Sequence, residues 1–303
     1  MELRHLRYFI AVAEELHFAR AAERLHIEQS PLSRAIKDLE YDLGAQLFER
    51  TTRSTRLTWA GQVFLEQAHR VLIAVNQAMA SAKSATSGYH GRLRIALSDG
   101  IAQPRLSALL FQCREEEPDV EIRIFEMPFS EQVKGLRNDL LDAGFALISD
   151  AGKDLIAEPT WTDAILLAIP ARHPLLTHKR VALHDAVQYP LILSLPEFYT
   201  GHHRQIEALL RTVDIQPIVA DRVASLEVML TLVGAGYGIA FVMASQVAIF
   251  HRPDMAVRPL VNPSSVFTTF LVRPKIEPSG PLTRFIERAS RSGAHSCKTA
   301  AVQ

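Results

Sequence analysis

The chain has too little cysteine for a disulfide framework or a zinc finger. Its 303 residues include two cysteines, Cys113 within an expected helix and Cys297 close to the end of the sequence. These are too few and too far apart to build either kind of cross-linked site. We interpret Cys113 as a small buried apolar residue and assign it no chemical role.

Long hydrophobic runs are also missing. The longest, residues 165–169 and 239–242, have the length of strands, whereas a membrane-spanning helix needs roughly 18 apolar residues. The first residues include Glu2, Arg4 and Arg7 and lack the apolar segment of a signal peptide. With 48% hydrophobic residues the chain is long enough for two or three globular units. We therefore expect a folded cytoplasmic protein.

An excess of either charge is absent as well. The chain has 33 Lys and Arg against 33 Asp and Glu, and residues 1–58 balance at nine against nine. A protein that binds nucleic acid usually carries a basic excess. If this chain binds one, its positive and negative groups must therefore be separated in space.

Residues 17–58 contain two short amphipathic helices joined by a tight turn. The first is expected at 18–25, and the second begins with Ser30 as N-cap and Pro31 at the first helical position, running to about residue 43. Its apolar residues form one stripe, so Ser33, Arg34 and Lys37 must point away from the core. This pattern predicts a helix-turn-helix.

The residues after this motif predict a small hairpin. Arg50, Arg53 and Arg56 recur at every third position of the run 48–58. Such a hairpin is a wing that can place guanidinium groups along a phosphate backbone while the preceding helix enters the major groove.

Residues 6–61 closely resemble the LysR-type transcriptional regulators over more than fifty positions without a gap. The resemblance implies sequence-specific binding to promoter DNA, a small-molecule inducer, and RNA polymerase as a further partner if the protein is an activator. Neither a cofactor nor catalysis is expected. The residues expected to contact DNA are Arg20, Gln29, Ser30, Pro31, Ser33, Arg34, Lys37, Arg50, Arg53 and Arg56.

A long helix should follow the wing. Thr58 is its expected cap, and apolar residues repeat at spacings of three and four until about residue 85. A helix with one apolar seam favours a partner helix. The resemblance implies that two copies pair through this helix into dimers, and that dimers assemble into a homotetramer. The alternative is that the helix packs on its own C-terminal domain.

The remainder alternates strands and helices, which predicts α/β units with a parallel sheet. By resemblance, the last strand and helix return to the first unit and give two lobes, as in periplasmic solute-binding proteins. The expected fold class is thus α/β with an N-terminal winged helix-turn-helix, a long linker helix and a two-lobed effector domain. Expected boundaries are 1–58 for the DNA-binding domain, 59–87 for the linker helix, 88–91 for a hinge, 92–160 with 267–290 for lobe 1, 161–266 for lobe 2 and 291–303 for a disordered tail.

Ligands of open α/β sheets bind beyond the carboxyl ends of the strands, and two lobes would bring several such ends to one cleft. The three glycines at 234, 236 and 238 follow a helix, so they predict a tight turn and not a nucleotide site. The residues expected at the effector site are Ser98, Asp99, Ile101, Phe129, Ser130, Ser194, Pro196, Phe198, His202 and Val223.

The loop 197–204 leads into a helix whose N-terminal N–H groups favour an anion, and Arg204 could pair with a bound carboxylate. A metal site at His202 and His203 is disfavoured because no third ligand is near in sequence. Surface residues at a helix start are an equally good interpretation of this segment.

The resemblance makes Ser98, after the first strand, the most transferable effector contact. Regulators of aromatic degradation in the family often have Thr or Ser after the second strand and Arg in the third. This chain has Pro128 and Phe129 at the first place and Leu147 near the second. The inducer, an aromatic compound or an organic acid, is therefore not specified.

Two other functions remain open on the sequence alone. In one, the two-lobed domain captures or converts a small molecule and the winged helix is only an interaction module, although no nucleophile–base pair, phosphate loop or metal-ligand cluster is found. In the other, the protein binds DNA without sensing a ligand, and its C-terminal region serves assembly alone.

Overall fold

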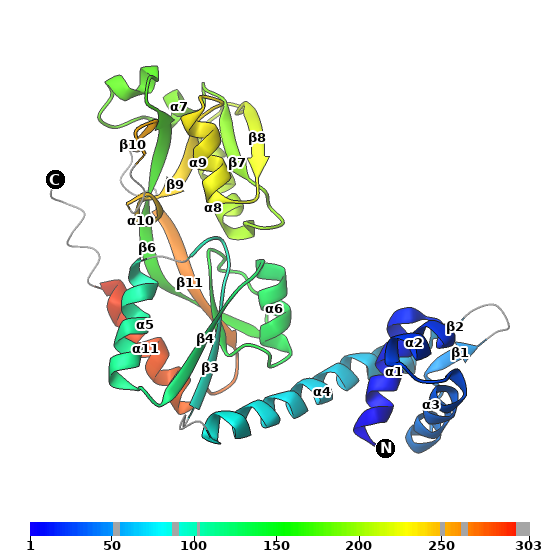
Figure 1. Cartoon of the computed structure of the whole chain (residues 1–303). Coiled ribbons are helices and arrows are strands. Elements are labelled where there is room, and N and C mark those ends of the chain that lie inside the picture. The colour runs from blue at the N-terminus through cyan, green and yellow to red at the C-terminus, as the bar shows by residue number, and fades with distance from the viewer. Residues whose placement is uncertain (51–54, 87–90, 102–103, 249–251, 262–265, 295–303) are drawn as a thin grey trace. The chain divides into compact units, whose positions relative to one another are not determined.

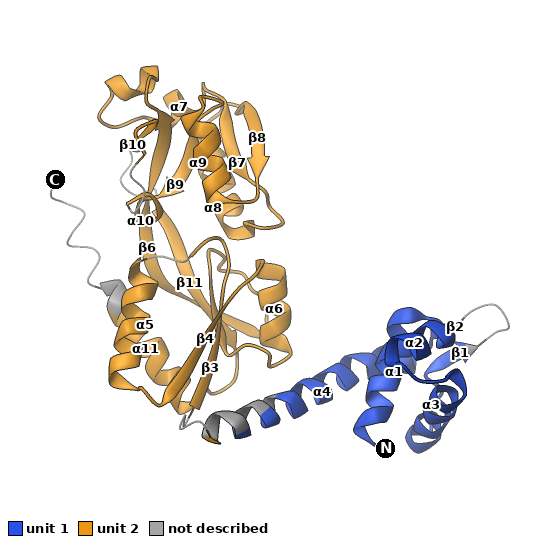
Figure 2. Ribbon diagram, in the orientation of Figure 1, with its two compact units in different colours: residues 1–83 blue, residues 84–303 orange. Residues whose placement is uncertain are grey.

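The computed structural model describes residues 1–50, 55–86, 91–101, 104–248, 252–261 and 266–294. Two compact units, residues Met1–Lys83 and Ser84–Gln303, divide the chain (Figure 2). Residues 88–90 of the expected hinge lie outside the described part. Within the described ranges, no helix has both the length and the apolar character needed to span a bilayer.

The first unit is built on three helices, α1 (Leu3–Glu15), α2 (Phe18–Leu25) and α3 (Gln29–Leu43) (Figure 1). Leu16 ends α1 in the left-handed region with φ of 47°. The ring of His17 then caps α2 by accepting a hydrogen bond from the backbone N–H of Arg20 at 3.3 Å. The apolar stripes of the three helices meet in one core, which confirms the expected helix-turn-helix.

The start of α3 differs from the expectation. Its N-cap is Glu28, so Ser30 lies inside the first turn and Pro31 is the third helical residue. The expectation was wrong because proline fits any of the first helical positions, where backbone N–H groups have no partner within the helix. Gly44 ends α3 with φ of +64°, in the left-handed region that glycine adopts without strain.

The wing consists of β1 (Phe48–Arg50) and β2 (Thr55–Leu57), paired antiparallel with Glu49 opposite Arg56. The carboxylate of Glu40 on α3 accepts the backbone N–H groups of Leu47 at 2.9 Å and Phe48 at 3.1 Å. The wing is thus fixed directly to the second helix of the motif.

The long helix α4 (Trp59–Thr86) begins as expected, because the hydroxyl of Thr58 accepts the N–H of Gly61 at 2.9 Å. A side chain at Gly61 would place its Cβ only 2.1 Å from the carbonyl oxygen of Leu47. The first turns of α4 can therefore pack closely on the winged module, where Phe64 and Leu72 extend its core.

The second unit has two lobes. In the first, β3 (Gly91–Leu97) lies between β4 (Val120–Glu126) and β5 (Ala143–Ala146), all parallel as expected. Alternate side chains of these strands enter two different cores on the two faces of the sheet. The helices α5 (Pro104–Glu116) and α11 (Gly280–Ala294) cover one face, and α6 (Phe129–Arg137) covers the other (Figure 1).

The sheet is mixed, so the expectation of a parallel sheet is wrong beyond β5. The long strand β6 (Leu155–Pro170) and β11 (Val266–Pro274) are antiparallel neighbours. With β10 (Met255–Pro259) and β9 (Ala240–Met243), the strand order is β10-β6-β11-β5-β3-β4, and β9 also pairs with β6. Both long strands pass from one lobe to the other (Figure 1). β6 runs without interruption through positions 160 and 161, where the sequence suggested a lobe boundary.

The second lobe is built around the C-terminal part of β6, which pairs with β9 and β10. It also contains a short parallel pair, β7 (Leu191–Ser194) and β8 (Val219–Val223). Two helices pack on this pair, α8 (Thr200–Leu210) and α9 (Leu226–Gly234). Four short elements were not expected from the sequence. They are α7 (Leu183–Ala186), the 3-10 turn Pro174–Thr177, α10 (Ala244–Val247) and β10 (Met255–Pro259); β9 (Ala240–Met243) was expected.

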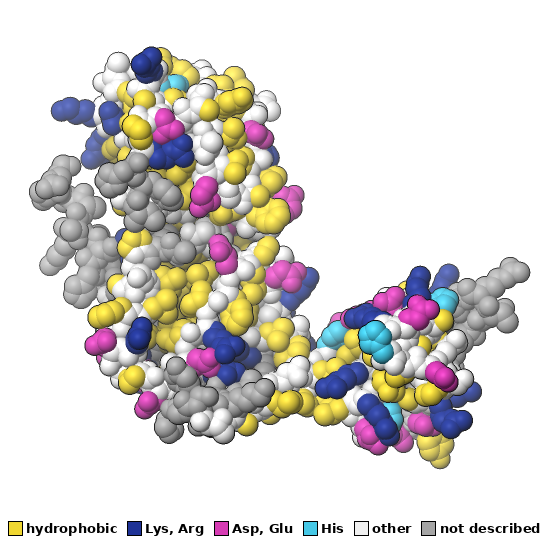
Figure 3. Space-filling model, in the orientation of Figure 1, with side chains coloured by type: hydrophobic (Ala, Val, Ile, Leu, Met, Phe, Trp, Pro, Cys, Tyr) yellow, Lys and Arg dark blue, Asp and Glu magenta, His cyan; other side chains and the backbone are white. Residues whose placement is uncertain are grey.

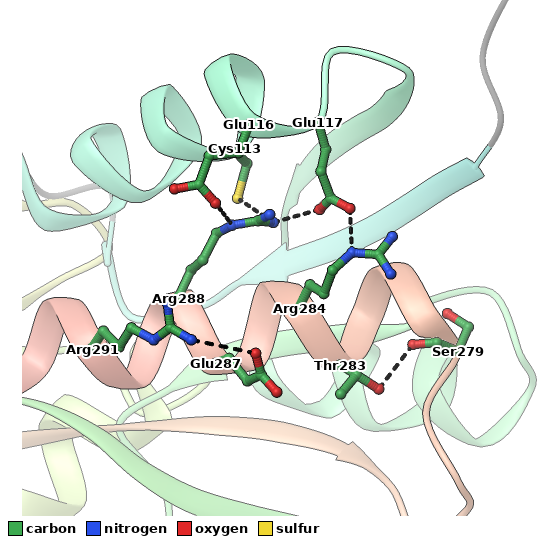
Figure 4. A network of polar contacts seen from close by, with 9 residues as sticks. All are labelled: Cys113, Glu116, Glu117, Ser279, Thr283, Arg284, Glu287, Arg288 and Arg291. Carbon is green, nitrogen blue, oxygen red and sulfur yellow. Dashed lines mark hydrogen bonds and ion pairs between the residues drawn. The ribbon is translucent and has the colours of Figure 1, made fainter.

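The last helix is tied to α5 by a buried arginine (Figure 4). Arg288, whose side chain is 7% exposed, donates to Glu116 at 2.6 Å and Glu117 at 2.5 Å, and Arg284 also pairs with Glu117. Burial raises the pKa of the neighbouring Cys113 thiol, which keeps this thiol protonated. α11 extends to Ala294, so the expected tail from residue 291 begins too early; residues 295–303 lie outside the described part.

Candidate functional sites

The outer face of α3 is polar and exposed. Leu32, Ile36 and Leu39 are completely buried and fix the orientation of the helix. At about 100° per residue, the opposite face carries Ser30, Ser33, Arg34 and Lys37 at spacings of three and four. Gln29, Ser30, Pro31, Arg34 and Lys37 are exposed, and Ser33 is half-buried.

Most of the described cations that are expected to contact DNA do not form ion pairs. Arg34, Lys37 and Arg56 form no salt bridge with any described residue. Arg20 differs, because its guanidinium donates to the carbonyl of Glu15 at 2.6 Å and lies 3.6 Å from that residue's carboxylate. Three of the expected contacts therefore present unpaired positive charge to solvent, and a fourth is already engaged.

Two of the three acidic residues in the second half of α3 are engaged within the unit, whereas Asp38 is exposed. Asp42 forms an ion pair with the N-terminal amine of Met1 at 2.8 Å, and that amine lowers the pKa of Asp42. Glu40 binds the start of the wing, as described above. Figure 3 shows cationic and acidic side chains interspersed on the visible face of this unit.

Two expected contacts cannot be placed. Arg50 is the last residue of β1, and nothing of its side chain is described; Arg53 lies in the segment 51–54, outside the described residues. Arg56, directly opposite Glu49 in the hairpin, is the wing arginine whose exposed side chain can be described.

The second candidate site lies between the lobes of the C-terminal unit. After β3 the chain makes a tight turn, in which Asp99 and Gly100 have φ of 56° and 66° and the N–H of Ile101 bonds the carbonyl of Ser98 at 3.2 Å. Aspartate tolerates this left-handed conformation better than most residues. The turn directs the carboxylate of Asp99 toward the second lobe.

Asp99 is 2% exposed and caps α8. One carboxylate oxygen accepts the backbone N–H groups of Gly201 at 2.8 Å and His202 at 3.1 Å. The other oxygen accepts the hydroxyl of Ser98 at 2.9 Å and the N–H of Leu147 at 3.4 Å. Burial raises the pKa of Asp99, while these four donors oppose that rise.

This arrangement changes the expectation for the loop 197–204. The N-terminal N–H groups of α8 do face an anion, but the anion is the protein's own carboxylate. Arg204, the expected partner of a ligand carboxylate, is exposed. Among the described residues, no group of three or more metal-ligating side chains could hold a metal ion.

His202 is a buried neutral base. Its Nδ1 lies 2.9 Å from the hydroxyl of Ser194, and the carbonyl of Phe241 accepts a hydrogen bond from the ring. Burial lowers its pKa from 6.5 to about 4. With Phe241 as acceptor, the other ring nitrogen carries the proton, so Ser194 donates to Nδ1.

A small cavity opens beside these residues in the second lobe. Its volume is about 10 Å³, room for about one water molecule. A larger ligand must therefore displace part of the wall or separate the lobes. The cavity is lined by Ser194, Tyr199, His202, Val223, Ser225, Leu226, Met229 and Gln246.

Further hydrogen bonds hold the two lobes together next to this cavity. The side-chain amide of Gln205 on α8 donates to the carbonyl of Leu147 at 2.8 Å, and that of Gln246 donates to the carbonyl of Gly100 at 3.2 Å. Gly201 allows the close approach, because a Cβ there would lie 2.7 Å from the Cβ of Leu147 and 2.8 Å from Asp99.

The expected effector residues divide into three groups. Ser194, His202 and Val223 line the cavity, and Ser98 and Asp99 join it to the first lobe. Ile101 and Phe129 pack in the two cores of the first lobe. Ser130 and Phe198 are exposed, and the carbonyl of Pro196 accepts the hydroxyl of Thr200.

Five further lining residues were not among those expected. Tyr199 and Ser225 fall in segments that follow strands, so the strand-end rule could have included them. Leu226, Met229 and Gln246 had no local signal, because their place depends on how α9 and α10 pack in the second lobe.

Two protein families match the chain, one on each side of residue 86. Residues 3–62 match the family described as bacterial regulatory helix-turn-helix protein, lysR family. Residues 86–293 match the family described as LysR substrate binding domain. Together these matches cover most of the sequence.

Similar proteins align over nearly their whole lengths. The uncharacterized HTH-type transcriptional regulator YnfL of Escherichia coli is 35% identical, over 90% of this chain and 92% of that protein. The regulator BenM of Acinetobacter baylyi is 30% identical, over 89% of each. The crystal structure of full-length CbnR complexed with its target DNA has a TM-score of 0.74 at 30% identity and covers 96% of this chain and 100% of that one.

Proposed function

Because the chain belongs to the LysR family, it is a DNA-binding transcriptional regulator with an effector-binding domain and not an enzyme, and we propose that the exposed face of α3 reads its promoter site. Ser30, Ser33 and Arg34 contact base edges or nearby phosphates. Lys37 and the wing arginine Arg56 contact the phosphate backbone. The protein acts in the cytoplasm, where promoter DNA is found.

The observation that carries this proposal is the unpaired charge on one helix face. Arg34 and Lys37 lie on the same exposed stripe, and neither forms an ion pair with a described acidic residue, although the exposed Asp38 lies one helical turn after Arg34. Phosphates can therefore take the place of their water and counterions without breaking an existing ion pair. Gln29, Pro31, Arg20, Arg50 and Arg53 complete the proposed contact set.

One winged module supplies few cations, so affinity must come from more than one subunit. α4 spans 28 residues, about 42 Å at 1.5 Å per residue. Val63, Val71 and Met79 remain exposed along it in a single chain. We assign 59–87 to a dimerisation helix that joins two modules, and dimers assemble into a tetramer.

In the C-terminal unit, the cavity between Ser194, His202 and Val223 is the proposed effector site. Lobe 1 takes in 92–160 and 267–294 and lobe 2 takes in 161–266, with β6 and β11 passing through both. The hydrogen bonds that Asp99 accepts, together with those that Gln205 and Gln246 donate, hold the lobes in the observed arrangement. A ligand that enlarges the cavity changes this arrangement only if it binds the two arrangements unequally.

Footprinting on the DNA upstream of the protein's own gene tests the proposal. A dimer with two recognition helices should protect two half-sites related by a dyad and separated by a multiple of about 10 base pairs. Protection of a single unsymmetrical site, or no protection at all, would contradict it. The matched control is the same DNA with one half-site scrambled, which should lose most of the protection.

A further inference from the structure

The N-terminus of α8 is where a ligand carboxylate would bind most favourably, because free N–H groups and the helix dipole favour negative charge there. In this chain Asp99 reaches that place from the other lobe. Its contacts with Gly201 and His202, at 2.8 and 3.1 Å, satisfy the first donors of the helix.

The carboxylate of Asp99 has no capacity left for a ligand. A carboxylate offers about four acceptor positions, and four donors already occupy them. Three of these donors are backbone N–H groups, which can donate a hydrogen bond but cannot accept one. An incoming carboxylate would have to displace Asp99 completely, and an incoming ammonium group would find no free acceptor on it.

The other polar groups around the cavity are uncharged. No lysine or arginine is among the described residues that line it, and His202 is neutral at pH 7. The hydroxyls of Tyr199 and Ser225 and the amide of Gln246 are uncharged; the Ser225 hydroxyl also accepts the N–H of Val228, and the Gln246 amide donates to Gly100 and accepts from Met243. Burial raises the pKa of Tyr199, and the nearby carboxylates of Glu126, Glu227 and Asp99 raise it further, so the hydroxyl is protonated and its surroundings are negative.

We propose that Asp99 fills the anion-binding N-terminus of α8 from within the chain, and that the effector of the adjacent cavity is therefore a small uncharged polar molecule and not an organic acid. The proposal rests on the effector role assigned above to this cavity. An anion would be buried near carboxylates without a counter-ion, and a cation would find no carboxylate among the residues that line the cavity; both cost more than burying hydroxyl or amide groups that find partners.

The variant Asp99→Gly tests the assignment by chemical rescue. Glycine suits the φ of 56° at this position and leaves the end of α8 open. Acetate should then raise the melting temperature of the C-terminal unit in the full-length variant in a saturable manner, by about 2–4 °C, as expected for a stabilisation near 1 kcal/mol in a unit of this size. Wild-type protein should not respond to acetate at the same concentration and ionic strength.

Acetamide is the matched uncharged probe, and chloride controls for ionic strength. Neither should distinguish Asp99→Gly from the wild type. The proposal is overturned if acetate stabilises wild type and variant equally, or if the folded variant gains nothing from acetate. Should the variant fail to fold, its refolding yield in acetate against acetamide gives the same comparison, and equal yields overturn the proposal.

This experiment involves neither DNA nor an effector, so its failure leaves the proposed regulator intact. A second measurement addresses the ligand itself. Uncharged metabolites and organic acids of similar size are compared for their effect on the binding of wild-type protein to its promoter. An organic acid that shifts this affinity, and loses its effect in Ser225→Ala, would confirm the effector site while refuting the uncharged class.

Discussion

Arg288 of the C-terminal unit and Arg34 of the N-terminal unit have opposite environments. In the C-terminal unit Arg288 is buried and bound by two carboxylates, whereas Arg34 of the N-terminal unit is exposed and has no ion pair with any described residue. A buried cation that lost its partners would be costly, so its pairing serves the fold. An exposed unpaired cation contributes little to the fold and is available to a polyanion.

Substitutions can therefore change the stability of the fold and the affinity for DNA separately. Changes at Arg288 or in the cleft should alter the free energy of unfolding of the C-terminal unit. Changes on α3 should alter DNA affinity and leave unfolding nearly unchanged. Each of the following substitutions tests one of these two expectations.

The largest effect is expected for Arg288→Ala. It leaves Glu117, which it shares with Arg284, partly unpaired near a buried thiol, and breaking a buried pair costs about 3–5 kcal/mol. Urea unfolding followed through Trp161, which is 2% exposed, measures the loss. Arg291→Ala is the matched control, because Arg291 is exposed and its pair with Glu287 spans 3.6 Å. Equal losses in both variants would refute the structural role of Arg288.

A pH dependence of stability is expected from His202. Its pKa is lowered to about 4 in the folded protein from 6.5, so between these values the unfolded chain binds a proton that the native protein does not. The contribution of His202 to the free energy of unfolding is therefore fully present above pH 6.5 and is lost as the pH decreases toward 4.

Between pH 7 and 5 the loss should be about 2 kcal/mol from this group. Urea unfolding of wild type and His202→Asn at both pH values isolates it, since asparagine does not titrate. Hydrogen bonds lower the pKa of Glu116, from Gln112 and Arg288, and the pKa of Glu117, from Arg288 and Arg284, so both contribute mainly below pH 4.5 and stay out of this window. A variant that keeps the full pH 7 to 5 loss would show that His202 is not its source.

On the DNA side, Arg34→Ala should weaken binding to the promoter by about 1–3 kcal/mol and relax base preference at the contacted position. Fluorescence anisotropy with labelled promoter DNA measures it. Arg24→Ala is the control, because Arg24 is paired with Glu14 at 2.7 Å and lies outside the proposed contacts. If Arg24→Ala weakened binding as much as Arg34→Ala, unpaired charge would not be the property that marks the contact.

The smallest effect is expected for Lys37→Ala. A phosphate contact carries no sequence information, so affinity should fall by the same factor for promoter and unrelated DNA. The slope of log K against log salt should decrease by about 1. A change in sequence preference without a change in slope would instead place Lys37 at a base.

The sequence predicted the winged module well because its signals are local. Helical stripes, the cap at Thr58 and the hairpin depend on residues a few positions apart. The start of α3 was misplaced by local ambiguity, since Pro31 is acceptable at several positions of a first turn. The mixed sheet was missed because the pairing of β6 with β11 joins residues about 100 positions apart.

The site in the C-terminal unit was predicted only in part, because many of its contacts join residues far apart in the sequence. Ser98, Asp99 and Ser194 follow strands, and that rule placed them correctly near one another. The role of Asp99 could not be predicted, because its donors Gly201 and His202 lie 102 and 103 positions away. The carboxylate of Asp99, which was expected to contact the effector, accepts its hydrogen bonds from within the chain instead.

The most direct test of the central claim is the specificity of the full-length protein at physiological salt. The affinity for its own promoter is compared with that for a scrambled duplex of the same length, in the wild type and in Arg34→Ala. The account predicts a wild-type preference of about 10³-fold or more, reduced by about tenfold or more in the variant. A wild-type ratio near one, or a ratio unchanged by the substitution, would contradict the assignment of the α3 face as the surface that reads DNA.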